Sequence, residues 1–235
     1  VSCGGNHWPL VHCLLPCPND CSNQMAFSMK EYPLFLAGQW IQSNQTLSVN
    51  APWDGTELAR VHLADESLIE QAIQKGLEAQ KSLLHWPAYK RADFLRELAL
   101  KLKSQAERFA LSLAREAAKP YQDALGEVLR ASETFLIASE EARRFSGEYM
   151  RLDWTAAGEG LSGRTRWVPS GLVAGISPFN FPLNLAVHKL APAIACGAPI
   201  VLKPASSTPL ATLMLAELFQ EVGGLPQGAV SILPA

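Results

Sequence analysis

The sequence predicts an α/β fold with a parallel sheet, preceded by a helical region and a small β region. Three observations support this prediction. Residues 171–235 alternate between short apolar runs and longer helical stretches. Residues 65–145 carry long amphipathic periodicities, and residues 35–61 carry short extended runs broken by Gly and Pro. Alternating strands and helices of such lengths are typical of parallel sheets.

Composition places the chain among ordinary globular proteins. Of its 235 residues, 48% are hydrophobic and 18% are charged, as in typical folded domains. The formal net charge is only −2, so the chain has no basic field for a nucleic acid backbone or an anionic membrane. We therefore expect no nucleic acid partner and no membrane partner.

Residues 1–28 are expected to be an unstructured or non-native leader, because globular patterning begins near Met29. Four of the five cysteines lie in this leader, at positions 3, 13, 17 and 21. Zinc sites usually have tighter paired spacings, so we expect no metal. The leader also has no basic n-region, and its apolar run is too short for a signal core. A cytoplasmic protein is the resulting expectation.

The first elements are expected in the order strands, then helix. Residues 35–41 are predicted to be a strand broken by a Gly turn, and residues 47–61 to contain extended runs around a turn at Asp54-Gly55. Asp65 is predicted to be the N-cap of the first helix. The apolar stripe of that helix consists of Leu68, Ile69, Ala72, Ile73 and Leu77.

Two longer helices are predicted next. One runs from about Pro87 to Ala118 and ends at Lys119-Pro120, and the other runs from about Asp123 to Phe145. The buried side of the first is expected to contain Phe94, Leu95, Leu98, Leu102, Phe109, Leu113 and Ala117. We interpret the many charged residues of these helices as solvated outer faces of a packing scaffold.

Residues 148–168 have a different pattern. Three glycines surround Leu161, and residues 163–168 alternate like a strand with one polar face. An exposed strand needs an edge to pair with. Two interpretations stay open: an oligomerisation arm and an internal β-hairpin.

The last 65 residues predict the parallel sheet. Residues 173–176 and 200–202 are short apolar runs of the kind found in strands that are buried on both faces. Residues 183–195 and 208–222 are predicted to be helices, and residues 230–233 a third strand.

Candidate site residues lie where these strands end. Asn180 stands between two aromatic residues and two prolines in the motif SPFNFP, where a strand leads into a helix. A rigidly held amide there can donate a hydrogen bond to developing negative charge, although asparagine also stabilises turns. Lys203 and Ser206 follow the second strand, at the edge where open α/β sheets bind ligands.

These motifs resemble those of the NAD(P)-dependent aldehyde dehydrogenases. The resemblance is carried by SPFNFPL, HKLAPAIACG, VLKPASSTP and the closing run GLPQGAVSILP, and it extends more loosely back to Phe35. It implies that residues 29–235 form the amino-terminal part of that family's Rossmann-like cofactor-binding domain, which is therefore incomplete here.

The resemblance also implies roles for single residues. Asn180 matches the oxyanion-hole asparagine, and Lys189 matches a helix lysine implicated in proton movement, with a surface lysine as the alternative. Lys203 and Ser206 match positions at the adenosine ribose. Ser206 stands where the family usually has Glu, which makes NADP a candidate cofactor beside NAD. The positions that match the wall of the cofactor site are Ile176, Ser177, Pro178 and Phe179.

The implied function is oxidation of a small aldehyde to a carboxylic acid through a cysteine thiohemiacetal, in a homodimer or homotetramer. The family's nucleophilic cysteine lies downstream of the matched segment, so we expect this chain to be inactive alone. Cys196 lies in an apolar helix and is expected to be an inert thiol. The alternatives are a non-catalytic truncated module or scaffold, and a related reductase of acyl phosphates.

Overall fold

The computed structural model describes residues 30–235, and the predictions for residues 1–28 lie outside this range. Its central element is a five-stranded sheet in the order β3-β2-β10-β9-β8. Strands β8 (Val173–Ile176), β9 (Ile200–Lys203) and β10 (Val230–Ile232) are parallel to one another. The predicted α/β fold with a parallel sheet is confirmed.

A hairpin from the start of the chain completes this sheet. Strand β2 (Leu34–Leu36) pairs antiparallel with β10, and β3 (Gln39–Ile41) pairs antiparallel with β2. The buried Ser231 hydroxyl accepts a hydrogen bond of 2.9 Å from the Ala37 amide at the hairpin turn. The hairpin therefore belongs to the main sheet and not to the separate β region that the sequence suggests.

A smaller sheet forms beside it. Strand β5 (Glu57–His62) lies between β1 (Lys30–Tyr32) and β4 (Thr46–Asn50), parallel to β1 and antiparallel to β4. This is the predicted small β region, now restricted to residues 30–32, 46–50 and 57–62.

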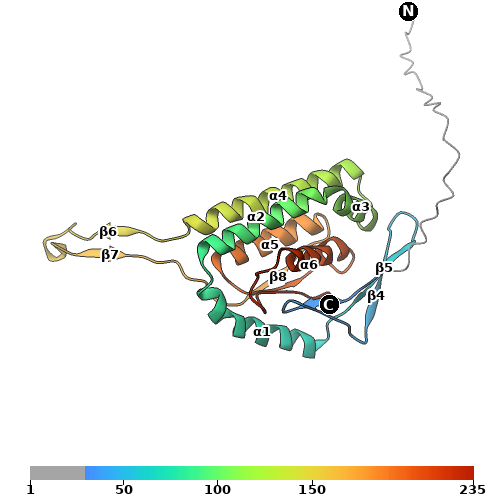
Figure 1. Cartoon of the computed structure of the whole chain (residues 1–235), viewed down its shortest axis with the longest axis horizontal. Coiled ribbons are helices and arrows are strands. Elements are labelled where there is room, and N and C mark those ends of the chain that lie inside the picture. The colour runs from blue at the N-terminus through green and yellow to red at the C-terminus, as the bar shows by residue number, and fades with distance from the viewer. Residues whose placement is uncertain (1–29) are drawn as a thin grey trace, which may run out of the picture.

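Helices cover both faces of the main sheet. Helices α5 (Pro182–Cys196) and α6 (Leu210–Val222) lie on one face, and α1 (Glu66–Leu84) lies on the other (Figure 1). Side chains alternate along β9, because successive strand residues point to opposite faces. Ile200 joins the core under α5 and α6, whereas Val201 packs with the α1 side.

Helix α1 begins as predicted but buries a different stripe. The Asp65 side chain accepts a hydrogen bond of 2.9 Å from the Leu68 amide, as expected of an N-cap. Leu77, however, is 44% exposed. Small residues form most of the buried stripe instead. Gly76, for example, packs against Leu172 just before β8, where a Cβ would lie only 2.6 Å from Leu172 Cδ1. The buried residues of α1 are Ala72, Gly76, Ala79 and Leu83.

The outer helical layer differs from the prediction in one place. The helix expected over residues 87–118 is divided into α2 (Ala88–Ser104) and α3 (Ala106–Glu116), because Gln105 leaves the helical region with φ −105° and ψ 19°. The break directs α3 towards α6, and Glu116 at its end reaches the first turn of α6. Helix α4 (Tyr121–Arg144) packs against α2, α3 and α5.

Residues 148–168 form a hairpin that extends away from the body (Figure 1). Strands β6 (Tyr149–Arg151) and β7 (Ser162–Arg164) pair antiparallel, and the short 3-10 helix Ala156–Gly158 lies between them. The segment is thus a β-hairpin in its local structure, and the oligomerisation arm stays a prediction. The regular strand ends at residue 164, earlier than the expected 163–168. Amide hydrogen bonds from Thr165 to the Glu148 carbonyl and from Trp167 to the Ser146 carbonyl continue the pairing towards the body, where the ring centroids of Trp167 and Phe145 lie 5.9 Å apart.

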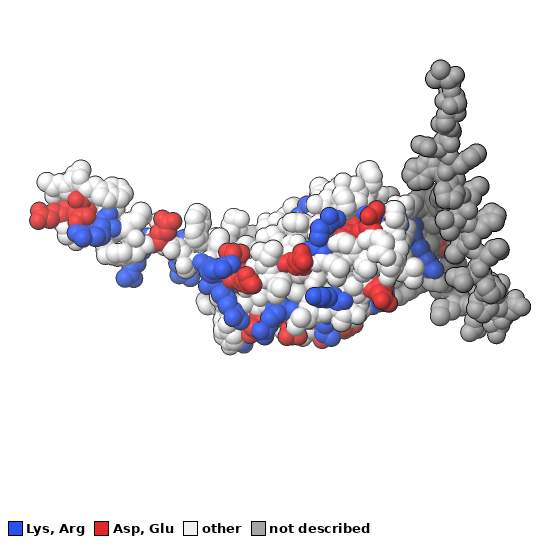
Figure 2. All heavy atoms as spheres, turned by 90° about the horizontal axis from the view of Figure 1, so that it is seen from above, with Lys and Arg blue, Asp and Glu red and all other residues white. Residues whose placement is uncertain are grey.

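The surface carries both signs of charge. Figure 2 shows Lys and Arg interspersed with Asp and Glu over the face that it presents. Within residues 30–235, no group of three His, Cys, Asp or Glu side chains is placed to hold a metal ion. Over the same residues, none of the helices is long and apolar enough to cross a membrane.

Candidate active site

The carboxyl edge of the parallel strands brings the candidate residues together. Strand β8 leads to Asn180 before α5, and β9 leads to Lys203 and Ser206 before α6. The Ser177 amide donates a hydrogen bond of 3.0 Å to the Lys203 carbonyl, which ties the two loops to each other. The two segments that the sequence singled out therefore lie at one edge of the sheet, as open α/β sheets require.

Asn180 is exposed at the amino-terminal end of α5. The N-cap of that helix is Phe181, whose φ is −135° and ψ 69°, and no side chain of the cap residue bonds to the first turn. Among the residues that the structure describes, none forms a hydrogen bond with the Asn180 side-chain amide, and only its backbone carbonyl is engaged. The turn is therefore not held by that amide.

The first turn of α5 is capped by Glu127 of α4. Its Oε1 accepts hydrogen bonds from the amides of Leu183 and Asn184, at 3.0 and 3.1 Å. Its Oε2 lies 2.5 Å from Lys119 Nζ, and the Glu127 side chain is 0% exposed. A helix N-terminus favours negative charge, and here the chain supplies that charge itself.

Helix α6 is capped in the same way by Glu116 of α3. The two Glu116 oxygens accept hydrogen bonds from the amides of Leu210 and Ala211, at 2.8 and 2.9 Å. Burial is the main cause that raises the pKa of the Glu116 carboxyl from 4.5 to about 7, while these two hydrogen bonds lower it. The carboxyl is therefore poised to titrate near neutral pH.

The prediction that the charged residues of these helices lie on solvated faces is wrong for these two glutamates. Both are fully buried, and sequence analysis missed them. The signal was their spacing: Glu116 follows Leu113 by three residues, and Glu127 follows Ala124 by three, each in phase with a buried stripe.

The residues expected at the cofactor are arranged as an apolar wall with a polar corner. Ile176 is 71% exposed and Phe179 66% exposed, which is unusual for such side chains, and Pro178 is also exposed. Ser177 is buried, so it can contribute its backbone only.

The polar corner is formed by Lys203 and Ser206. Lys203 Nζ lies 3.1 Å from Ser206 Oγ, so the cation and the hydroxyl meet. A groove of about 450 Å³ opens beside them. It is lined by Leu47, Ser48, Val49, Asn50, Pro52, Glu116, Ala117, Phe179, Ser206, Ser207 and Thr208.

Lys189 lies along α5. Its ammonium group donates a hydrogen bond of 3.0 Å to the Leu185 carbonyl, one turn back in the helix. Its aliphatic stem packs near Gly175 of β8, where a Cβ would lie 3.4 Å from Lys189 Cδ and 2.9 Å from Leu202 Cδ1. A glycine at position 175 thus lets the helix approach the strand closely.

A second groove, of about 430 Å³, borders Asn180 directly. Phe181 forms part of it, with Lys119 Nζ 4.8 Å and Arg130 Cζ 5.2 Å from its ring centroid. Among the described residues, the Arg130 guanidinium has no ion-pair partner. The full lining consists of Lys119, Gln122, Asp123, Gly126, Arg130, Asn180 and Phe181.

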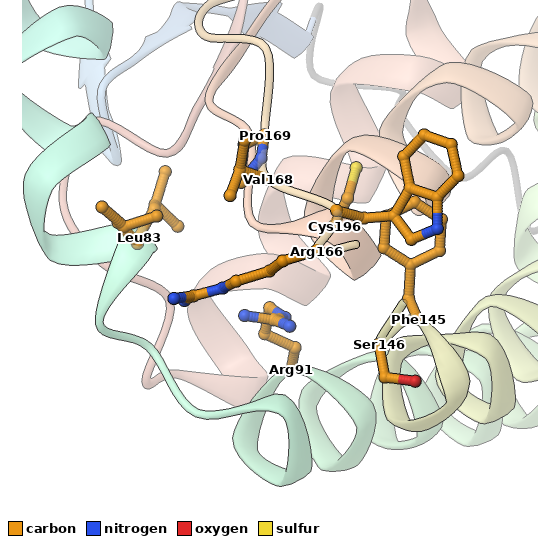
Figure 3. Close-up of a pocket in the computed structure, with 10 residues that line it drawn as sticks. Leu83, Arg91, Phe145, Ser146, Arg166, Val168, Pro169 and Cys196 are labelled. Carbon is orange, nitrogen blue, oxygen red and sulfur yellow. The ribbon is translucent and has the colours of Figure 1, made fainter. Parts of the chain in front are cut away.

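A third pocket, of about 210 Å³, lies at the opposite end of α5 (Figure 3). Arg91, Arg166 and Cys196 line it. Burial is the main cause that raises the pKa of the Cys196 thiol, so the thiolate is scarce at neutral pH. Cys196 ends the helix that Asn180 precedes, roughly 20 Å away at the rise of an α-helix. It is not placed to react beside Asn180.

Comparisons with known proteins agree with this arrangement. The family model described as "Aldehyde dehydrogenase family" matches residues 40–235. The 3-sulfolactaldehyde dehydrogenase of Priestia aryabhattai is 37% identical over 205 residues, covering 87% of this chain and 42% of the relative. The NADP-dependent glyceraldehyde-3-phosphate dehydrogenase of Streptococcus equinus is 35% identical over 205 residues, covering 87% and 43%.

The solved structures agree as well. Aldehyde dehydrogenase 21 of Physcomitrella patens, in complex with its reaction product succinate, superimposes with a TM-score of 0.86 and 41% identity. That match covers 88% of this chain and 44% of the other. The chain thus spans less than half the length of the relatives it matches. With its sheet, its asparagine turn and these matches in agreement, the chain belongs to the aldehyde dehydrogenase family.

Proposed function

We propose that the full-length protein, meaning this chain joined to the rest of the family sequence, oxidises an aldehyde to a carboxylic acid with NAD or NADP. Residues 29–235 are then the amino-terminal part of its cofactor-binding domain. The observation that carries the proposal is the exposed Asn180 amide, which is not used to hold its own turn. The adjoining coding sequence is the direct check. An in-frame cysteine segment supports the proposal, and a genuine stop codon would leave a non-catalytic module.

The residues of this chain have distinct tasks in that reaction. The Asn180 amide donates a hydrogen bond to the oxyanion that forms when a cysteine thiolate, supplied from outside this chain, attacks the aldehyde carbon. Bound NAD(P)⁺ supplies the hydride acceptor. Ile176 and Phe179 offer it an apolar wall, and Lys203 with Ser206 offers hydrogen bonds to the ribose. Lys189 is a candidate proton carrier.

The polar corner favours NADP as a cofactor. A carboxylate at position 206 would repel a 2′-phosphate. The Ser206 hydroxyl now donates a long hydrogen bond of 3.2 Å to the Ala235 carbonyl, and it can rotate to donate to a phosphate instead. Lys203, which lies 3.1 Å from that hydroxyl, can pair with the same phosphate. The Streptococcus equinus relative is an NADP-dependent enzyme, which agrees with this proposal.

A Ser206→Glu variant of the full-length protein is expected to lower kcat/KM for NADP about tenfold or more, since a charged hydrogen bond is worth roughly 1.5–3 kcal/mol. The kcat/KM for NAD should fall by a smaller factor, or should rise. Steady-state kinetics with both cofactors measure the ratio. An unchanged ratio would show that position 206 does not face the ribose.

We further propose that the aldehyde carries an anionic group. The groove beside Asn180 contains Lys119 and Arg130 against one carboxylate, Asp123. Glu127 already neutralises Lys119, which leaves the Arg130 guanidinium for a ligand. Guanidinium groups bind carboxylate and phosphate in a two-pronged geometry. Anionic groups also occur in the substrates after which the Priestia and Streptococcus relatives are named, and in the succinate bound to the Physcomitrella patens enzyme.

An Arg130→Met variant tests this substrate class. With succinic semialdehyde, kcat/KM is expected to fall about tenfold or more, because a charged hydrogen bond of roughly 1.5–3 kcal/mol is lost. With butanal, which has no anionic group, kcat/KM should change little. Arg143→Met on the same helix, which removes an exposed pair with Asp93, is the control. Equal losses with both aldehydes would contradict an anion site at Arg130.

The arm formed by β6 and β7 is proposed to join copies of the chain in a homodimer or homotetramer. Its exposed aromatic residues support this, since Tyr149 is 64% and Trp154 78% exposed. Sedimentation of a full-length variant that lacks residues 148–168 should show smaller species. If the variant sediments with the same number of subunits as the natural protein, the subunit interface lies elsewhere.

A further inference from the structure

We propose that Lys119 and Glu127 form a positioning pair for Asn180. The pair holds the backbone of Asn180 so that its side-chain amide keeps the orientation that oxyanion stabilisation needs. This inference rests on the proposed role of Asn180. In it, neither Lys119 nor Glu127 touches the substrate.

The Asn180 amide has to be oriented through its backbone. Its side chain has no hydrogen-bond partner among the described residues, and it is exposed. The backbone carbonyl of Asn180, in contrast, accepts a hydrogen bond of 3.0 Å from Lys119 Nζ. This bond fixes the peptide plane between residues 180 and 181, and with it the direction in which the Asn180 side chain leaves the main chain.

The same network holds the chain on the other side of the turn. Lys119 Nζ also donates to Glu127 Oε2, at 2.5 Å, while Glu127 Oε1 binds the amides of Leu183 and Asn184. The ring of Phe181, between these two anchors, lies under the Lys119 ammonium. One ion pair therefore fixes the backbone before and after the Phe181-Pro182 step.

Helix capping alone does not require the lysine. Glu116 caps α6 with two hydrogen bonds of similar length. Burial raises the pKa of Glu116 and the Lys119 charge lowers it, but within residues 30–235 no Lys or Arg lies close enough to form an ion pair with it. Of the two buried capping glutamates, only the one at the Asn180 turn is paired with a lysine. That lysine is also the one that reaches the Asn180 carbonyl.

The backbone before Lys119 is strained. Ala118 has φ of 48°, a left-handed conformation that is unfavourable for a residue with a Cβ. Its side chain is exposed, so its own packing does not explain the conformation. Ala118 follows the C-cap residue Ala117 of α3, and a left-handed residue at this position commonly ends a helix and redirects the chain. Here it accompanies the placement of Lys119 between Glu127 and Asn180.

A double-mutant cycle in the full-length protein tests the inference. Lys119→Met is expected to lower kcat about tenfold or more, since a misplacement of about 1 Å can cost 10²-fold. In the Asn180→Ala background the same change should cost less than about twofold, because residues that act as a unit are not additive. The dissociation constant of the cofactor should stay the same. Lys119→Arg, which keeps a cationic donor, should retain most of the activity.

Two further variants separate positioning from stability. Lys119→Met leaves the buried Glu127 carboxylate unpaired, which can prevent folding. The double variant Lys119→Met with Glu127→Gln removes both charges and leaves an acceptor for the α5 amides, and it should fold and show the same loss of kcat. Lys101→Met removes an exposed pair with Glu221 and is expected to leave kcat unchanged.

Each outcome separates the pair from Asn180 itself. If Asn180→Ala lowers kcat but the Lys119 variants do not, or if their losses multiply, the positioning role is wrong and the oxyanion role stands. Failure of Lys119→Met and of the Lys119→Met, Glu127→Gln double variant to fold would assign the pair to stability instead. If Asn180→Ala leaves kcat unchanged, the oxyanion role fails, and the positioning role fails with it.

Discussion

Replacing Asn180 with alanine in the full-length protein is expected to lower kcat on the order of 10²–10³-fold, because one oxyanion donor is lost. The effect should be confined to the chemistry. The amide is exposed and does not hold its own turn, so cofactor affinity and the free energy of unfolding should barely change. Steady-state kinetics, cofactor titration and urea unfolding of the variant measure these three quantities.

The outcome discriminates between the two roles that the sequence leaves open for Asn180. A fall in kcat of less than about threefold, together with a loss of roughly 2 kcal/mol in stability, would make it a structural turn residue. Asn44→Ala removes another exposed asparagine, outside the candidate site, and serves as the control. It should leave kcat and stability unchanged.

Replacing Glu116 with alanine is expected to lower the free energy of unfolding by about 3 kcal/mol. It leaves the buried amides of Leu210 and Ala211 without acceptors, at roughly 1–3 kcal/mol each. Because these amides begin α6, directly after the Lys203 and Ser206 loop, NADP binding should weaken as well. Glu221→Gln, an exposed change near the other end of α6, should affect neither quantity.

Glu116 also predicts a pH dependence of stability. Its folded-state pKa, about 7, lies above the unfolded value of 4.5, so the folded state binds more protons between these two values. The stabilisation is fully present below pH 4.5 and is lost as the pH rises through 7. Between pH 5 and pH 8, the natural protein should lose about 2 kcal/mol more stability than Glu116→Gln, which cannot titrate. Parallel losses in both proteins would place the folded-state pKa near its ordinary value.

Much of the fold could be predicted from local patterns. The strand and helix order of residues 171–235 follows from apolar runs and turn residues, and the structure places each element within a few residues of the expected position. The resemblance to the family rests on contiguous motifs in the same region. Asn180, Lys203 and Ser206 could be singled out because each stands next to the end of a predicted strand, where the chain order alone implies a shared edge.

Other features depend on contacts between residues far apart in the chain. The hairpin at 34–41 completes the main sheet by pairing with β10, almost 200 residues later, and no local pattern specifies that edge. The break at Gln105 likewise has no local signal, since the apolar spacing continues across it.

The sequence by itself determined the alternating architecture, the family resemblance and the identity of the exposed asparagine. Only the tertiary structure decided what surrounds that asparagine. Glu116 and Glu127 are charged residues of a type that usually faces solvent on a helix. They are buried because Glu127 binds the unpaired amides at the start of α5 and Glu116 binds those at the start of α6. Long-range packing of the helices places each carboxylate at such a helix end. Local hydrophobic periodicity does not predict that packing.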